Sequence, residues 1–284
     1  MSNRPDFTFC DDFVARFEEV IEHPAPTGGP YLTGVDLGTA CVVLAVLNEA
    51  GQPVAGAYQY ADVVRDGMVV DYIGAIQLVR RMKEELEEKL GEELLYAAAA
   101  IPPGTDSLDG GAVRNVAESA GFEVTVMLDE PTAANRLLNL QNGAIIDIGG
   151  GTTGISILKD GEVVMTDDEA TGGTHVSLVI AGSYHKSFED AERYKRDPKN
   201  HKELFPVVKP VMAKMATIIG DMLDDYEAES GEKVDDLVLV GGTACFTGLE
   251  QEVERLVGIP TYKPKNPLFV TPLGIALSCV KGDE

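Results

Sequence analysis

The sequence has few positive charges: 23 Lys and Arg residues face 47 Asp and Glu residues, which gives a formal net charge of −24. A surface of that sign repels the phosphate backbone of nucleic acids and the anionic headgroups of lipids. We therefore expect no nucleic-acid partner and no membrane partner. A nucleotide can still bind in a cleft, because backbone N–H groups and a metal ion act on it at close range.

Cysteine pairs and long apolar runs are also missing. The four cysteines are scattered, with no CxxC pair and no histidine at metal-ligand spacing, so we predict reduced and mostly buried thiols. No apolar run approaches the roughly 18 residues that span a bilayer. The polar start of the chain is not typical of a signal peptide. We therefore expect a cytoplasmic protein.

The chain lacks the GxxxxGK[ST] pattern, which excludes a P-loop as the phosphate-binding element. Its 284 residues, of which 44% are hydrophobic, can bury a sizeable core and favour two lobes over one. We expect a helix and linker over residues 1–30, a first lobe over 31–142 and a second lobe over 143–284. The C-terminal helix of the second lobe is expected to return to the first.

The N-terminal segment ends in a Pro/Gly cluster at residues 23–30, which stops any helix. Before it, Phe13, Phe17, Val20 and Ile21 recur at helical spacing and predict a short amphipathic helix. Two interpretations stay open. The helix packs on its own protein, as exposed apolar faces normally do, or it detaches to bind a partner or to direct encapsulation.

The most informative feature of the sequence is an internal repeat. Three strands joined by turns are predicted within residues 31–60, followed by alternating helices and strands up to a helix that begins at Pro131. From residue 144 the same order starts again. In the first copy we expect helices over 74–90 and 109–120 and strands over 94–101 and 123–128. In the second copy we expect strands over 144–148, 154–159, 162–166 and 236–240. We also expect helices there, near 174–188, 190–195, 206–229 and 245–257.

Each copy places an aspartate just before a glycine-bearing turn: Asp36 before Gly38, and Asp147 before the run that starts at Gly149. Glycine lets backbone N–H groups converge on a phosphate without a Cβ in the way, and threonine adds a hydroxyl donor. Carboxylates beside such turns suit a hydrated magnesium ion. A single Gly-Gly-Gly-Thr-Thr run would equally suit an ordinary tight hairpin, but the duplication with its aspartate retained favours a phosphate site.

Five motifs, in the same order along the chain, resemble the phosphate 1, connect 1, phosphate 2, adenosine and connect 2 motifs of the actin/Hsp70/sugar-kinase superfamily. They lie at residues 35–39, 129–134, 146–153, 239–243 and 271–276. The resemblance covers residues 31–280 and implies a duplicated ribonuclease H-like α/β fold, with two lobes around a cleft that binds ATP or ADP and Mg²⁺. In detail the chain is similar to the EutJ family of ethanolamine-utilisation operons, described as chaperone-like and associated with bacterial microcompartments.

The resemblance also implies residue roles. Asp36 and Asp147 would hold hydrated magnesium, with Asp147 also catalytic, and Glu130 would orient or deprotonate the attacking water. The remaining residues would contact the nucleotide. For the phosphates these are Gly38, Thr39 and Ala40 on one side and Gly150, Gly151, Thr152 and Thr153 on the other; for the adenosine they are Glu192, Lys195, Gly241, Gly242 and Thr243. Gly149 and the pair Gly172 and Gly173, which matches the family's second glycine pair, would also bind the nucleotide.

Simpler interpretations of three of these segments stay open. Asp129 or Glu130, followed by Pro131, is ordinary chemistry for the start of a helix. The Gly-Gly-Thr run at 241–243 would suit any anion or a simple tight connection. Glu192 and Lys195 would form a solvated i,i+3 salt bridge.

The chain also departs from Hsp70. Few residues separate the first phosphate loop from Ile101, so the large inserted subdomains of Hsp70 are reduced or absent, and the lysine that Hsp70 places over the γ-phosphate has no obvious counterpart. We therefore expect slow hydrolysis, or hydrolysis activated by a partner. The chain stops soon after the 271–276 motif, so we expect no peptide-binding domain.

Three functions follow from these features. The first is an ATP-dependent, chaperone-like protein whose lobes close on ATP and grip a client or microcompartment protein. The second is an assembly or scaffold protein that self-associates under nucleotide control, with little turnover. The third is a small-molecule kinase, since the same fold hosts such enzymes, although the reduced insert argues against an acceptor site.

Overall fold

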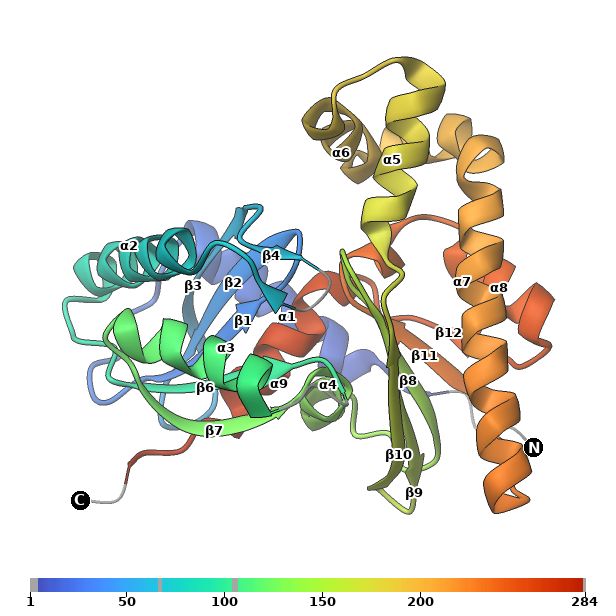
Figure 1. Cartoon of the computed structure of the whole chain (residues 1–284). Helices are drawn as coiled ribbons and strands as arrows, with labels where there is room; N and C mark the ends of the chain where they lie inside the picture. The colour runs from blue at the N-terminus through green and yellow to red at the C-terminus, as the bar shows by residue number, and fades with distance from the viewer. Residues whose placement is uncertain (1–4, 66–67, 104–106, 283–284) are drawn as a thin grey trace. The chain divides into compact units, whose positions relative to one another are not determined.

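The computed structural model describes residues 5–65, 68–103 and 107–282, leaving aside the side chains of 107–110 (Figure 1). The chain divides into two compact units. The first unit comprises Asp6–Asn139 and Phe269–Glu284, and the second is built on Leu140–Leu268. Each unit contains its own five-stranded mixed sheet, which gives an α/β protein.

The sheet of the first unit has the order β3-β2-β1-β6-β7. Its strands β1 (Leu32–Leu37), β2 (Cys41–Leu47) and β3 (Pro53–Tyr60) form an antiparallel meander, and β6 (Tyr96–Ile101) and β7 (Glu123–Asp129) continue it in parallel with β1. Every residue of β2 is buried, because helices cover both faces. A small antiparallel pair, β4 (Val64–Arg65) and β5 (Met68–Val69), stands apart from this sheet.

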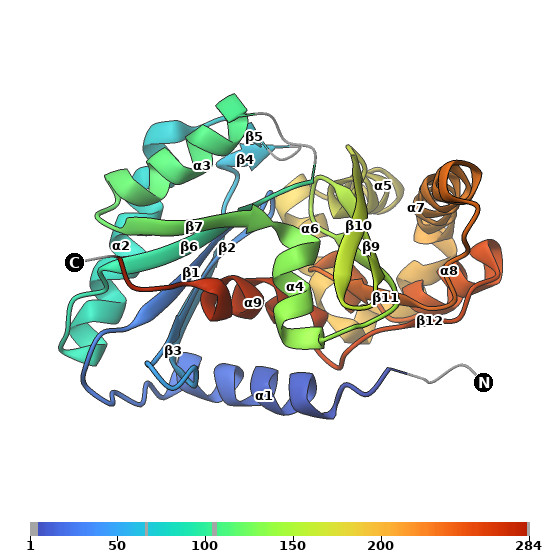
Figure 2. The same cartoon turned by 90° about the horizontal axis from the view of Figure 1, so that it is seen from below.

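Helices α2 (Tyr72–Leu90) and α3 (Ser107–Ser119) cover one face of this sheet, and α1 (Thr8–Glu22), α4 (Glu130–Leu138) and α9 (Val270–Ser278) cover the other (Figure 2). The alanine run of β6 serves both faces, because successive side chains of a strand alternate. Ala97 and Ala99 belong to the core under α2 and α3, whereas Ala98 and Ala100 contact the core that includes Ile275 of α9.

Helix α1 packs on the first unit rather than standing free. Its Phe17 is fully buried, and a Cβ added to Gly56 of β3 would lie 2.3 Å from the Phe17 ring. The same ring meets Phe269 edge-on, with ring centroids 5.3 Å apart. Of the two interpretations of the N-terminal segment, the structure therefore shows the docked helix.

The sheet of the second unit has the order β10-β9-β8-β11-β12. Strands β8 (Gly143–Ile148), β9 (Thr153–Lys159) and β10 (Glu162–Glu169) form its antiparallel meander, and β11 (Leu237–Val240) and β12 (Thr261–Tyr262) add the parallel strands. This order matches that of the first unit strand for strand. The internal repeat and the duplicated fold predicted from the sequence are therefore confirmed.

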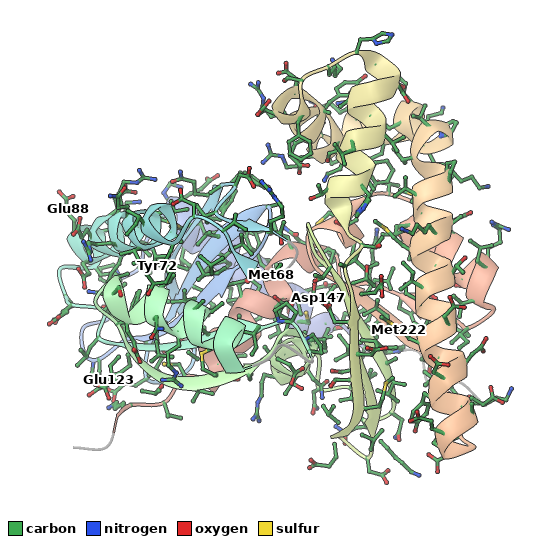
Figure 3. The ribbon with its side chains drawn as sticks, in the orientation of Figure 1. Met68, Tyr72, Glu88, Glu123, Asp147 and Met222 are labelled. Atoms are coloured by element: carbon green, nitrogen blue, oxygen red, sulfur yellow. The ribbon has the colours of Figure 1, made fainter. Side chains whose placement is uncertain are left out.

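Helices α5 (Gly173–Tyr184), α6 (Phe188–Arg196), α7 (His201–Ser230) and α8 (Leu249–Val257) share one hydrophobic core with this sheet. The buried face of α7 contributes methionines to that core, among them Met222 (Figure 3). None of the helices in the described part of the chain is long and apolar enough to cross a membrane. Each of the four cysteines, all within the described residues, is a thiol rather than half of a disulfide, and Cys245 is the exposed one.

Three helix boundaries predicted from the sequence are wrong. Helix α7 begins at His201, with Pro206 and Pro210 inside it, because its buried apolar face offsets the hydrogen bonds that the prolines cannot make. The helix predicted over 245–257 begins at Leu249, after Gly248 with a φ of 95°. Helix α5 ends at Tyr184, since His185 adopts the left-handed conformation with a φ of 52°.

Candidate functional site

The glycine-rich loop of the second unit joins β8 to β9. Asp147 is the penultimate residue of β8 (Figure 3). Its side chain is buried, with 6% exposed. After it, the backbone N–H of Gly149 donates to the carbonyl oxygen of Thr152 over 3.0 Å and closes the turn. The buried Thr153 side chain donates to the carbonyl oxygen of Thr171 over 2.6 Å, which links the loop to the segment before α5.

The start of α5 is bonded directly to this loop. Gly173 N–H donates to the Gly149 carbonyl oxygen over 3.0 Å, and Thr174 N–H donates to that of Gly150 over 2.7 Å. A Cβ added to Gly172 would lie 2.7 Å from the Gly150 carbonyl oxygen. Position 172 therefore requires glycine because two backbone segments meet there.

The run at 241–243 reaches the same loop from β11. Gly241 has a φ of 87°, and a Cβ at this position would lie 2.3 Å from Asp147 Oδ1. Thr243 Oγ1 donates to the Gly149 carbonyl oxygen over 2.6 Å. A Cβ at Gly173 would lie 2.3 Å from Thr243 Oγ1. The phosphate 2 and adenosine motifs, 94 residues apart in sequence, thus meet at Gly149.

Glu192 and Lys195 of α6 form the predicted i,i+3 ion pair, with Lys195 Nζ 2.8 Å from Glu192 Oε2. The pair is not solvated: the side chains of Lys195 and Glu192 are 11% and 14% exposed. Lys195 Nζ also donates to the Gly173 carbonyl oxygen over 3.0 Å, and the Ser177 hydroxyl donates to Glu192 Oε2. Burial lowers the pKa of Lys195. The simpler interpretation of a solvated pair is therefore wrong, because the pair anchors α6 to the start of α5.

Sequence reasoning missed Asp168 of β10. This residue pairs with Gly154 across the β9–β10 ladder, beside the glycine-rich loop. Burial raises the pKa of Asp168 to about 7; the Thr152 hydroxyl, which donates to its carboxylate, opposes the rise, and the charge of Asp147 adds to it. Its Oδ1 atom is buried and has no hydrogen-bond partner within the described residues. The separation of Asp147 and Asp168 along the chain does not indicate from sequence alone that the two carboxylates are neighbours. The folded meander of β8, β9 and β10 brings them together.

Asp168→Asn should stabilise the ligand-free protein at pH 8 and give no gain at pH 4. A carboxyl whose pKa is raised in the fold costs stability as pH rises from its unfolded value of 3.8 towards about 7, and asparagine removes that cost. The melting temperature should rise by a few degrees, since each kcal/mol corresponds to about 2–4 °C at this size. Thermal unfolding at both pH values tests this, with Asp224→Asn on the exposed face of α7 as control. An equal shift at pH 4 and pH 8 would contradict it.

The first unit holds the remaining predicted residues at the carboxyl edge of its parallel strands. Asp36 lies at the end of β1 and is half-buried, and a Cβ at Gly38 would lie 2.8 Å from the Cys41 carbonyl oxygen, so the turn is tight. Thr39 and Ala40 complete the turn between β1 and β2, and the Ala40 carbonyl oxygen accepts from the Ala61 N–H over 3.3 Å.

Glu130 opens α4 directly after β7, so it follows a strand of the same sheet. The cap of this helix is Asp129, whose Oδ1 accepts from the Thr132 N–H over 2.8 Å. Helix capping thus explains Asp129 and Pro131. It does not require a glutamate at position 130.

The donor set of the second unit fits a hydrated magnesium ion. No group of three or more His, Cys, Asp or Glu side chains gathers into a metal site within the described residues. Magnesium keeps several water ligands and needs only one or two carboxylates. Asp147 and Asp168 supply carboxylate oxygens at this place, one of them the buried Oδ1 without a protein partner among the described residues.

Two family models each match about half of the chain. The model for "Type IV pilus assembly protein PilM" matches residues 117–267, and the model for "MreB/Mbl protein" matches residues 39–189. Among curated proteins, the ethanolamine utilization protein EutJ of Escherichia coli K12 is 46% identical over 256 residues, which cover 90% of this chain and 88% of that protein. The chaperone protein DnaK of Akkermansia muciniphila is 26% identical, over 72% of this chain and 40% of DnaK.

Solved structures show the same relationships. The crystal structure of EutJ from Carboxydothermus hydrogenoformans superposes with a TM-score of 0.86 at 47% identity and covers 94% of this chain and 97% of that one. MreB 5 of Spiroplasma citri, bound to AMPPNP, superposes with a TM-score of 0.68 at 18% identity, over 87% of this chain and 95% of that one. The fold is therefore that of the actin-like ATPases.

Proposed function

Since the chain belongs to the EutJ family of ethanolamine utilisation proteins, we propose that it is an ATP- and magnesium-binding switch of that system, with slow ATP hydrolysis and chaperone-like action on a partner protein. One observation carries the proposal. The start of α5 and the segment after β11 donate hydrogen bonds to the carbonyl oxygens of Gly149 and Gly150 in the glycine-rich loop beside Asp147, and α6 is joined to the start of α5 through the Gly173 carbonyl oxygen.

The likeness to actin-like proteins supports this proposal, because MreB 5 of the same fold is bound to AMPPNP in its structure. Fold alone does not decide function. The residues add what the fold cannot: a Cβ added to Gly149 of the loop would lie no nearer than 3.7 Å to a neighbouring atom, and two carboxylates, Asp147 and Asp168, lie beside the loop. A protein of the ethanolamine utilisation system, or of a microcompartment, is the partner that we propose.

The proposed residue roles follow the chemistry of each side chain. When bound, ATP supplies the phosphoanhydride bond and Mg²⁺ the charge that neutralises its phosphates. Asp147 and Asp168 would hold the water shell of the ion in the second unit, and Asp36 would do so in the first. Glu130 would orient the attacking water and accept its proton. The phosphates would lie against Gly38, Thr39 and Ala40 and against Gly149, Gly150, Gly151, Thr152, Thr153, Gly172 and Gly173, and the adenosine against Glu192, Lys195, Gly241, Gly242 and Thr243.

Asp147→Ala should abolish magnesium-dependent ATP binding, whereas Glu130→Gln should keep binding and lose turnover. The first change removes the carboxylate beside the loop; the second removes only the group that accepts a proton, a contribution of about 10²–10⁴ in rate. Calorimetry with MgADP measures binding, and phosphate release measures turnover.

The matched control for this experiment is Asp224→Ala on the exposed face of α7, which removes the same charge elsewhere in the second unit. It should bind and turn over as the wild type does. Equal MgADP affinity in the wild type and in Asp147→Ala would refute the assignment of the site.

The match to the pilus-assembly and MreB/Mbl models favours a second candidate, a nucleotide-switched assembly or scaffold protein with little turnover. Sedimentation with and without MgATP separates the two. ATP-dependent filaments favour assembly, and an unchanged small species favours the chaperone-like switch.

A further inference from the structure

His201, the first residue of α7, joins two elements of the second unit that the proposed site uses. It is 4% exposed, and its ring stacks on that of Phe246 with centroids 4.0 Å apart and planes 15° apart. Its Nε2 lies 2.8 Å from the Lys195 carbonyl oxygen, and its Nδ1 lies 3.0 Å from both the backbone nitrogen and the Oγ1 of Thr247. The imidazole thus bridges the end of α6 and the segment that follows Thr243.

The partners of the ring fix its tautomer. The Thr247 N–H can only donate, so Nδ1 carries no proton and accepts this bond. The Lys195 carbonyl oxygen can only accept, so Nε2 carries the proton and donates it. A doubly protonated ring would set two N–H groups against each other at Thr247. The bridge therefore requires the neutral imidazole.

Charged groups around the ring act on its pKa in both directions. Burial lowers the pKa of His201, and Lys263 adds to this, whereas the hydrogen bond to Lys195 O and the charge of Asp197 oppose it. Lys263 also donates to the carbonyl oxygens of Ala244 and Phe246 over 2.9 and 3.2 Å. The segment that carries Thr243 is therefore held by His201 and Lys263.

The two elements that His201 joins are also joined at the loop. Lys195 Nζ bonds the Gly173 carbonyl oxygen, and Thr243 Oγ1 bonds that of Gly149. With the Gly173–Gly149 hydrogen bond, these contacts form one closed set. It runs from the glycine-rich loop to the start of α5, on to α6, through His201 to the 243–247 segment, and back to the loop. Removing the imidazole bonds breaks this set of contacts between α6 and the 243–247 segment, and leaves the hydrogen bonds of the phosphate loop in place.

We propose that His201, in the tautomer that donates from Nε2, is a positioning residue for adenosine: it sets the spacing between α6 and the 243–247 segment without touching the nucleotide. This inference rests on the proposed function, because it takes Glu192, Lys195 and the run at 241–243 as the residues that hold the adenosine. The hydrogen bonds within the phosphate-binding loop, and those between it and the start of α5, involve neither His201 nor its partners.

His201→Phe tests the proposal, because phenylalanine keeps the stack on Phe246 and loses the hydrogen bonds of both ring nitrogens. The probes are ADP and inorganic pyrophosphate, which differ by the adenosine moiety. In calorimetry the variant should bind ADP about 10-fold more weakly, as the lost hydrogen bonds to Lys195 and Thr247 allow, and should bind pyrophosphate within about 2-fold of the wild type. On acidification below the ordinary pKa of histidine, the wild type should lose ADP affinity more steeply than His201→Phe does, because both proteins keep Asp168 and only the wild type keeps the imidazole.

His185→Asn is the control, since His185 is exposed in the same unit and its left-handed backbone suits asparagine. It should bind both probes as the wild type does. Equal ADP affinity in His201→Phe and the wild type overturns the proposal, and so does an equal loss for ADP and pyrophosphate, which would indicate a general structural role. A wild-type protein that binds neither probe overturns the proposed function, and with it this inference.

Discussion

Gly172→Ala is expected to weaken ADP binding by roughly 10- to 100-fold, from an overpacking cost of about 1–3 kcal/mol at about 1.4 kcal/mol per factor of ten. The new Cβ would lie 2.7 Å from the Gly150 carbonyl oxygen and 2.8 Å from the carbonyl carbons of Gly150 and Gly151. Each of these atoms is backbone, so no side chain can move aside to relieve the contact. The loop must shift, and with it the surface that we propose for the phosphates.

Calorimetry with MgADP measures this effect, and Gly182→Ala is its control. Gly182 lies on the same helix α5, and an added Cβ would have no neighbour within 4 Å. The control should bind ADP as the wild type does and should unfold at a slightly higher temperature, since alanine is the better helix former. Unchanged affinity in Gly172→Ala would show that the loop does not carry the phosphates.

Gly274→Ala is expected to destabilise the first unit by about 3 kcal/mol or more, at the upper end of overpacking costs. The added Cβ would lie 1.8 Å from the Ala133 carbonyl oxygen and 2.5 Å from its carbon. Helix α9 already packs closely on β1, where a Cβ at Gly34 would lie 2.6 Å from the Ala276 nitrogen and the Pro272 carbonyl oxygen. The helix is therefore held between α4 and β1 and has little room to retreat.

Urea or thermal unfolding measures this loss, with Gly220→Ala on α7 as the matched control. Gly220 has no atom within 4 Å of an added Cβ, so alanine there should stabilise by about 0.4–1 kcal/mol. Equal stability of Gly274→Ala and the wild type would mean that α9 shifts freely against α4. If Gly274→Ala does not fold while Gly220→Ala does, the prediction holds in its strongest form.

These contacts give a packing reason for two of the motifs found in the sequence. The segment at 271–276 lies in α9 and is buried throughout, and the segment at 129–134 supplies Ala133, over which Gly274 crosses. Small residues there let two helices and a strand approach at backbone distance. Part of the resemblance to the superfamily is thus a requirement of the fold rather than of chemistry.

The sequence by itself determined the strands, the repeat and the placement of the two aspartates. Apolar runs such as 41–47 and 144–148 predict buried strands, and a glycine-bearing turn after each aspartate marks where each meander begins. These signals are local: they depend on residues within one or two turns of chain, which a single sequence displays directly.

Only the tertiary structure decided which distant residues meet. It brought Thr243 to Gly149, set Asp168 beside Thr152, buried the Glu192–Lys195 pair and placed His201 between Lys195 and Thr247. It also kept Pro206 and Pro210 inside α7. Spacing along the chain cannot show such contacts, because the free energy that selects them comes from packing and hydrogen bonds between segments that the fold alone brings together.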